Sequence, residues 1–121
     1  MQKASNPHSI FKRRYPRRIY TNTVGVLYRG QYTLAQGSAL GEGGMAFHWP
    51  HSLPVEQGAV VTFKIPGNAM ISVRSEIRNC KVDLENPGSF IIGIQFLPLP
   101  IAEKRRIRAF VSSRLESEPS I

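Results

Sequence analysis

The sequence predicts an all-β fold with a terminal helix: a six-stranded antiparallel β-barrel followed by one C-terminal α-helix. Three observations support this. Short runs of alternating apolar and polar residues recur along the chain, glycine- and proline-rich turns separate them, and the period becomes helical after residue 100. Because closure removes the exposed edges of an antiparallel sheet, six short strands favour a barrel. The 121 residues, 41% of them hydrophobic, suit one domain with a single core.

The chain begins with a polar segment and then an arginine cluster. Residues 1–10 are predicted to form a flexible N-terminal tail, residues 11–115 the folded domain, and residues 116–121 a C-terminal tail. The arginine cluster is Arg13-Arg14-Tyr15-Pro16-Arg17-Arg18. Since proline lacks a backbone donor and biases the preceding residue toward extended conformations, we expect this segment to be extended or turning. Its side chains would then be free to fold over a ligand.

Six segments carry the strand pattern, namely residues 23–28, 31–40, 45–49, 59–65, 70–84 and 90–96. The second includes Tyr32 and Leu34 as apolar positions. The fifth changes phase near Asn79 and Cys80, which predicts a β-bulge. After Pro100 a helix is predicted, because four apolar residues fall at i, i+3, i+4 and i+8: Ile107, Phe110, Val111 and Leu115.

The formal net charge is +8, and the basic residues gather at the two ends of the chain. Residues 1–20 contain six basic residues, residues 21–101 are balanced at five basic and five acidic residues, and a second cluster follows in residues 104–114. Such clusters attract polyanions such as nucleotides, nucleic acids or anionic lipids. The plainer alternative is a soluble surface with arginine-rich ends.

The apolar runs, the N-terminal segment and the cysteine content indicate the cellular compartment. No apolar run approaches the roughly 20 residues needed to span a bilayer. The N-terminus does not resemble a signal peptide. Cys80 is the only cysteine, which excludes an internal disulfide and is compatible with a reducing compartment. We therefore expect a cytoplasmic domain without a membrane span.

The spacing of the arginines suits a phosphate-bearing ligand. Arg13 and Arg17 are four residues apart, and so are Arg14 and Arg18. A guanidinium group can hold two phosphate oxygens at once and can stack on a flat base. No acidic residue precedes Glu42, so nothing nearby in sequence neutralises the cluster.

The order of these parts resembles the PilZ domain, a bacterial receptor module for cyclic di-GMP. The resemblance covers about residues 11–115. The first motif of that family, RxxxR, is matched by Arg13 and Arg17, and Arg14 and Arg18 provide a second register. The resemblance implies a receptor without catalytic activity or cofactor. It would bind cyclic di-GMP and pass the signal to a protein partner that the sequence does not identify.

The second family motif, Asp/Asn-x-Ser-x-x-Gly, falls on Ala39, Gly41 and Gly44, and only Gly44 matches it. In the family, the acid or amide and the serine make polar contacts with the ligand. Ala39 and Gly41 can offer only backbone groups. Each lost hydrogen bond is worth on the order of 0.5–1.5 kcal/mol, so binding would be weaker by about tenfold to several hundredfold. Ser38 can replace the missing polar side chain only if it lies on the same face of the sheet as Ala39. Strict strand alternation predicts the opposite face for these two neighbours.

Other residues with chemical potential have simpler interpretations. We interpret His48 and His51 as exposed histidines at a strand end, because no further residues with metal-site spacing accompany them. Cys80 is expected to be a small buried apolar residue. The glycines of the turn at residues 41–44 are expected to need positive φ angles. The aromatic residues Phe47, Trp49 and Phe96 are expected in the core, and no catalytic arrangement is found.

Three functions remain open from the sequence. The first is a cyclic di-GMP receptor clamped by the N-terminal arginines. The second is a degenerate PilZ adaptor that binds no nucleotide and acts through protein–protein contacts. The third is a small basic barrel that binds single-stranded nucleic acid, which the few aromatic residues at outward-facing positions disfavour. DNA is accordingly not an expected partner.

Overall fold

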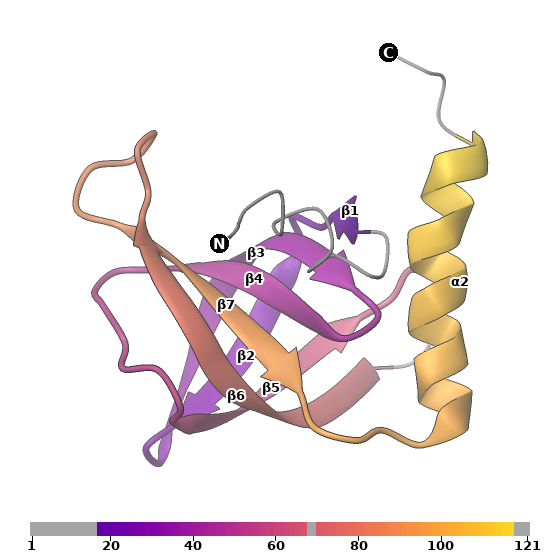
Figure 1. The fold of residues 1–121 in the computed structure, drawn as a ribbon, viewed down its shortest axis with the longest axis horizontal. Helices are drawn as coiled ribbons and strands as arrows, with labels where there is room; N and C mark the ends of the chain where they lie inside the picture. The colour runs from indigo at the N-terminus through magenta and orange to yellow at the C-terminus, as the bar shows by residue number, and fades with distance from the viewer. Residues whose placement is uncertain (1–16, 68–69, 118–121) are drawn as a thin grey trace, which may run out of the picture.

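The computed structural model describes residues 17–67 and 70–117 (Figure 1). It contains seven strands and one helix in this part of the chain: β1 (Arg17–Ile19), β2 (Thr23–Tyr28), β3 (Gln31–Gly41), β4 (Gly44–Trp49), β5 (Gly58–Lys64), β6 (Met70–Val82), β7 (Phe90–Phe96) and α2 (Ile101–Ser117). The six predicted strands and the C-terminal helix are confirmed, with β2 and β7 at their predicted bounds.

The strands form one closed antiparallel sheet. Its order is β1-β3-β2-β5-β6-β7-β4, and a further pairing of β3 with β4 closes the barrel. β1 is a seventh strand that the sequence pattern did not identify. It pairs with the end of β3, with Arg17 opposite Gly41 and Ile19 opposite Ala39. The second half of the arginine cluster is therefore built into the sheet.

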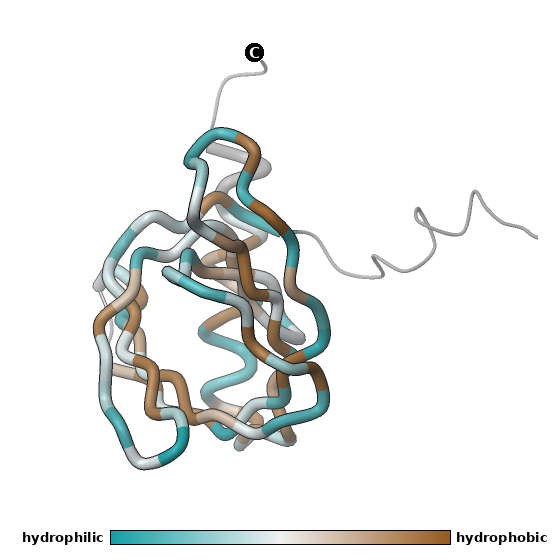
Figure 2. Tube along the Cα trace, turned by 90° about the vertical axis from the view of Figure 1, so that its left-hand side faces the viewer, coloured by the Kyte–Doolittle hydropathy of each residue, from teal (hydrophilic) through white to brown (hydrophobic). Residues whose placement is uncertain are grey.

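Every second side chain along the strands points into the barrel and forms its core. Val24, Val26, Phe47, Phe63 and Ile92 are all fully buried, and Figure 2 shows hydrophobic and hydrophilic residues alternating along the chain. The core aromatic residues behave as predicted, since Phe47, Trp49 and Phe96 are all buried. Two apolar residues of β3 are not part of this core. Tyr32 and Leu34 lie on the outside, 59% and 65% exposed, because β3 turns that face to solvent at its start.

Helix α2 packs against the barrel through its apolar face. Ile107 and Val111 are buried within the same core as the strands, and Phe110 is half-buried against it. Viewed from the left-hand side of Figure 1, the strands form a ring with α2 behind it (Figure 2). In the described part of the chain, no helix combines the length and apolar character needed to cross a membrane.

Two β-bulges interrupt the regular register. One lies between Gly37 and Ala39, where β3 meets β4. The other lies between Ile77 and Asn79, where β6 meets β7, close to the predicted phase change. A bulge adds one residue to one strand and can turn a side chain to the other face of the sheet. Both bulges lie beside the candidate site.

Candidate ligand-binding face

The β1–β3 pairing sends neighbouring arginines to opposite faces of the sheet. Successive side chains of a strand point to opposite faces, and residues directly opposite in an antiparallel pair share a face. Arg18 lies opposite Leu40, which is fully buried, whereas Arg17 lies opposite Gly41. Arg17 and Ile19 therefore project from the outer face, the side turned away from the core.

Arg18 is held by helix α2. Its Nη1 donates a hydrogen bond of 2.9 Å to the carbonyl oxygen of Phe110. Its guanidinium carbon lies 3.9 Å from the centroid of the Phe110 ring, a cation–π arrangement. The Arg18 side chain thus ties β1 to the helix, and the structure directs it away from the outer face on which Arg17 lies.

Tyr20 fixes the chain directly after β1. It is only 2% exposed, its hydroxyl donates to the carbonyl oxygen of Lys64 at 2.7 Å, and its ring meets Phe63 and Phe110 edge-on. Burial raises the pKa of the Tyr20 phenol above its ordinary value, so this hydroxyl stays protonated as a donor. The position of β1 is therefore set by packing on the helix side.

The turn between β3 and β4 is tied to the same helix by an ion pair. Arg108 Nε and Nη2 donate to the two carboxylate oxygens of Glu42 at 3.1 and 2.7 Å. Glu42 is 6% exposed. The hydrogen bonds from Arg108 hold the pKa of Glu42 below its ordinary value, so the carboxylate stays charged. Sequence reasoning missed this pair, because the two residues lie 66 positions apart.

On the outer face, three small residues form a row across neighbouring strands. Ala39 of β3 lies opposite Ala46 of β4, and Ala46 lies opposite Gly93 of β7. Gly41, two residues after Ala39, continues the same face. Ser38 is the extra residue of the bulge, and Ser38 and Ala39 are both half-buried, so strict alternation fails there. The short side chains of Ala39 and Ala46 allow a planar ligand group to approach the backbone closely there.

Gly44 is required by strand packing. A Cβ added at Gly44 would collide with the carbonyl oxygen of Ile94 on β7. Beside it, the Phe96 amide donates to the Gly43 carbonyl oxygen at 2.8 Å. The expectation of positive φ angles in this turn is wrong: Gly41 ends β3, and neither Gly43 nor Gly44 has a positive φ. Close approach of two backbones, rather than turn conformation, demands glycine at position 44.

Among the described residues, the two histidines and the cysteine have surroundings other than a metal site. His48 is half-buried rather than fully exposed, with Nδ1 3.2 Å from an oxygen of the buried Asp83. His51 is exposed, as predicted, and Cys80 is only half-buried. Within residues 17–67 and 70–117, no group of three or more His, Cys, Asp or Glu side chains is placed to hold a metal ion.

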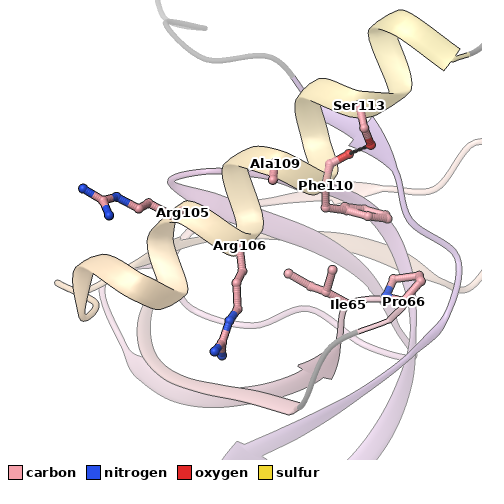
Figure 3. Close-up of a pocket in the computed structure, with 7 residues that line it drawn as sticks. All are labelled: Ile65, Pro66, Arg105, Arg106, Ala109, Phe110 and Ser113. Carbon is pink, nitrogen blue, oxygen red and sulfur yellow. Dashed lines mark hydrogen bonds between the residues drawn. The ribbon is translucent and has the colours of Figure 1, made fainter.

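A groove lies between α2 and the end of β5 (Figure 3). It has a volume of about 430 Å³. Four apolar residues, two arginines and a serine line it, namely Ile65, Pro66, Ala109, Phe110, Arg105, Arg106 and Ser113. Phe110 is shared between this groove and the Arg18 contact. The groove therefore borders the helix contact that fixes β1.

The structure brings four of the seven predicted site residues together. Arg17, Ala39, Gly41 and Gly44 meet along the β1–β3–β4 corner of the outer face, as the pairings of β1 with β3 and of β3 with β4 require. Arg18 is turned to the helix instead. The remaining two, Arg13 and Arg14, lie outside the described residues.

Comparison with known proteins identifies this architecture. A family model of the PilZ domain matches residues 11–113. No curated protein sequence matches the chain. Among solved structures, the Bacillus subtilis inhibitor of motility MotI/DgrA aligns with a TM-score of 0.81 and 12% identity over 89% of this chain and 53% of its own. This chain spans about half the length of that protein.

Two further solved structures contain cyclic di-GMP. The MrkH complex of K. pneumonia aligns with a TM-score of 0.70 and 19% identity, over 86% of this chain and 52% of its own. The PilZ domain of YcgR from Escherichia coli aligns with a TM-score of 0.62 and 14% identity, over 90% of this chain and 99% of its own. The family match over nearly the whole described fold, with these shared architectures, shows that the chain belongs to the PilZ domain family.

Proposed function

We propose that this protein is a non-catalytic receptor that binds cyclic di-GMP on the outer face at the β1–β3–β4 corner. The supporting observation is the β1–β3 register, which puts Arg17 of the RxxxR motif opposite Gly41 of the second motif. One cationic side chain and a flat backbone surface thus lie next to each other. Solved PilZ structures with this ligand, MrkH and the YcgR domain, share the fold.

The chemistry of the face fits a dinucleotide with two phosphates and two bases. The Arg17 guanidinium can donate to phosphate oxygens in charge-assisted hydrogen bonds, which are about twice as strong as neutral ones. Ala39 and Ala46 have short side chains and leave room for a base to lie close to the sheet. Since Ala39 and Gly41 offer no polar side chain, the arginines contribute a larger share of affinity than in members with the full motif.

We further propose that α2 carries the signal to a protein partner. Arg17 is followed directly by Arg18, which holds Phe110, and Gly41 is followed directly by Glu42, which holds Arg108. A ligand that shifts β1 would change the Arg18–Phe110 contact, and a ligand that shifts the β3–β4 turn would change the Glu42–Arg108 contact. The groove beside Phe110, with Arg105 and Arg106 at its rim, offers a partner an apolar floor and positive charge.

The test is isothermal titration of cyclic di-GMP at low salt with the full chain, Arg17→Ala and Arg105→Ala. Both variants lose one arginine, so the total charge is matched, but Arg105 lies on α2. We expect Arg17→Ala to bind at least tenfold more weakly, Arg105→Ala to bind normally, and wild-type affinity to fall as salt rises. Equal affinities for the two variants would refute the role of Arg17.

The adaptor function is the second candidate, and the polar-poor motif at Ala39 and Gly41 favours it. It predicts no heat of cyclic di-GMP binding by a correctly folded wild-type chain. It also predicts that a protein partner recovered from the source cell is lost on Arg105→Ala/Arg106→Ala. These outcomes separate an adaptor from a receptor.

A further inference from the structure

The β6 bulge turns Asn79 toward the proposed ligand face. Ile77 lies opposite Ile94 and is fully buried, whereas Asn79, two residues later, lies opposite Gly93 and is exposed. In a regular strand, residues two apart share a face. The extra residue of the bulge breaks this rule and places Asn79 on the outer face, where Gly93 and Ala46 lie.

The Asn79 carboxamide lies directly over Gly93. A Cβ added at Gly93 would lie only 2.7 Å from Asn79 Oδ1 and 2.8 Å from Nδ2. The amide therefore leans across β7 toward β4. Glycine at position 93 is what allows this, because any side chain there would displace the amide.

The pairings define a continuous row across four strands: Ala39, Ala46, Gly93 and Asn79. Neighbouring strands are about 4.8 Å apart, so Ala39 and Gly93 are separated by roughly 10 Å. A base lying on Ala46 would have the methyl group of Ala39 at one edge and the Asn79 amide at the other. The second edge carries the donor and acceptor that the first lacks.

We propose that Asn79 makes the hydrogen bonds to a ligand base that Ala39 cannot make, so that the polar contact of the site has moved to the opposite side of the row. This inference rests on the proposed function. A carboxamide has both donors and an acceptor and can pair with a purine edge. The proposal explains how a chain with alanine at the motif position can keep a base contact.

The experiment compares Asn79→Ala, Asn79→Asp and a control, Gln31→Ala, which removes an exposed amide at the distant start of β3. Titration of the full chains with cyclic di-GMP is expected to show about tenfold weaker binding for Asn79→Ala and no change for Gln31→Ala. Adding Ala39→Asn to Asn79→Ala is expected to restore affinity, because the amide returns at the other edge. A purely structural role of Asn79 predicts instead that Ala39→Asn raises affinity by the same factor in wild type and in Asn79→Ala, whereas the proposed contact predicts a larger gain in Asn79→Ala.

Selectivity gives an independent measurement. The guanine edge presents two neighbouring donors, N1–H and N2–H, to an acceptor-only carboxylate, whereas adenine presents one donor beside an acceptor. Asn79→Asp is therefore expected to raise the preference for cyclic di-GMP over cyclic di-AMP. A general effect of the added negative charge would weaken both ligands alike and leave their ratio unchanged.

The outcomes also separate this inference from the function on which it rests. Wild-type binding with unchanged affinity in Asn79→Ala would overturn the Asn79 contact and leave the receptor function standing. Failure of the Ala39→Asn rescue, or an unchanged ligand ratio in Asn79→Asp, would also count against the contact. No binding by the folded wild type would overturn both.

Discussion

The two faces of the β1–β3 ribbon use neighbouring residues in opposite ways. On the helix side, Arg18 contacts Phe110 of α2 and Leu40 is buried in the core. On the outer side, Arg17 and Gly41 border a surface of small residues. The difference arises from strand alternation alone, which divides one arginine cluster between the fold and the proposed ligand.

This contrast separates stability from binding. Side chains that hold α2, namely Arg18, Glu42 and Arg108, are expected to affect the free energy of unfolding. Side chains on the outer face, namely Arg17 and Asn79, are expected to affect ligand affinity with little change in stability. Gly44 lies where the two meet, because the motif glycine also lets β4 approach β7.

Gly44→Ala is expected to destabilise the fold by about 3 kcal/mol or more, because the new methyl group would collide with backbone that cannot rotate away. Gly43→Ala is the matched control, since a Cβ at that position meets nothing within 4 Å. Thermal and urea unfolding measure both. Similar stabilities for the two variants would show that Gly44 is retained for the ligand rather than for packing.

Arg108→Ala is expected to cost about 1–3 kcal/mol, since it leaves the buried Glu42 carboxylate without its charged donors. Arg105→Ala on the same helix removes an equal charge and is expected to change stability by less than about 0.5 kcal/mol. Urea unfolding at neutral pH compares them. An equal loss in both variants would assign the effect to net charge instead of the ion pair.

The same ion pair predicts a pH dependence with a defined sign. Because Arg108 lowers the pKa of Glu42 in the folded state, its contribution is present above the ordinary value of 4.5 and is lost as pH falls below it. Wild type should therefore lose more stability than Arg108→Ala between about pH 6 and pH 3.5. Parallel pH profiles of the two proteins would contradict this coupling.

Most of the fold was predictable because it depends on local patterns. Alternation and turns located β2 to β7, and the helical period located α2. β1 escaped because three residues rich in arginine carry no apolar alternation, and only pairing with β3 makes them a strand. Tyr32 and Leu34 show a second limit of pattern reading, because an apolar residue in a strand does not by itself show which face of the sheet is buried.

The candidate site was predictable only where a motif marks it. The two motifs include Arg17 and Gly44, which the strand pairings place at one corner of the barrel. The Glu42–Arg108 ion pair and the position of the Asn79 amide over Gly93 depend on contacts between residues distant in sequence, so no local pattern reveals them. The phase change near Asn79 did signal a bulge, and its consequence for the outer face followed only from the register of β6 and β7.

The smallest expected stability effect distinguishes the two adjacent arginines. Arg18→Ala should cost about 1 kcal/mol, because it removes a charged hydrogen bond and a ring contact at a half-buried site, whereas Arg17→Ala should cost less than about 0.5 kcal/mol. Arg18→Lys should recover only part of the loss, since an ammonium group cannot both stack flat on Phe110 and reach its carbonyl oxygen with guanidinium geometry. Unfolding measurements without nucleotide test this difference in stability. Titration of the same proteins with cyclic di-GMP is expected to show the larger loss of affinity in Arg17→Ala. If Arg17→Ala proved the less stable variant, the assignment of the two faces would be wrong, because strand alternation allows only one of these neighbours to face the helix.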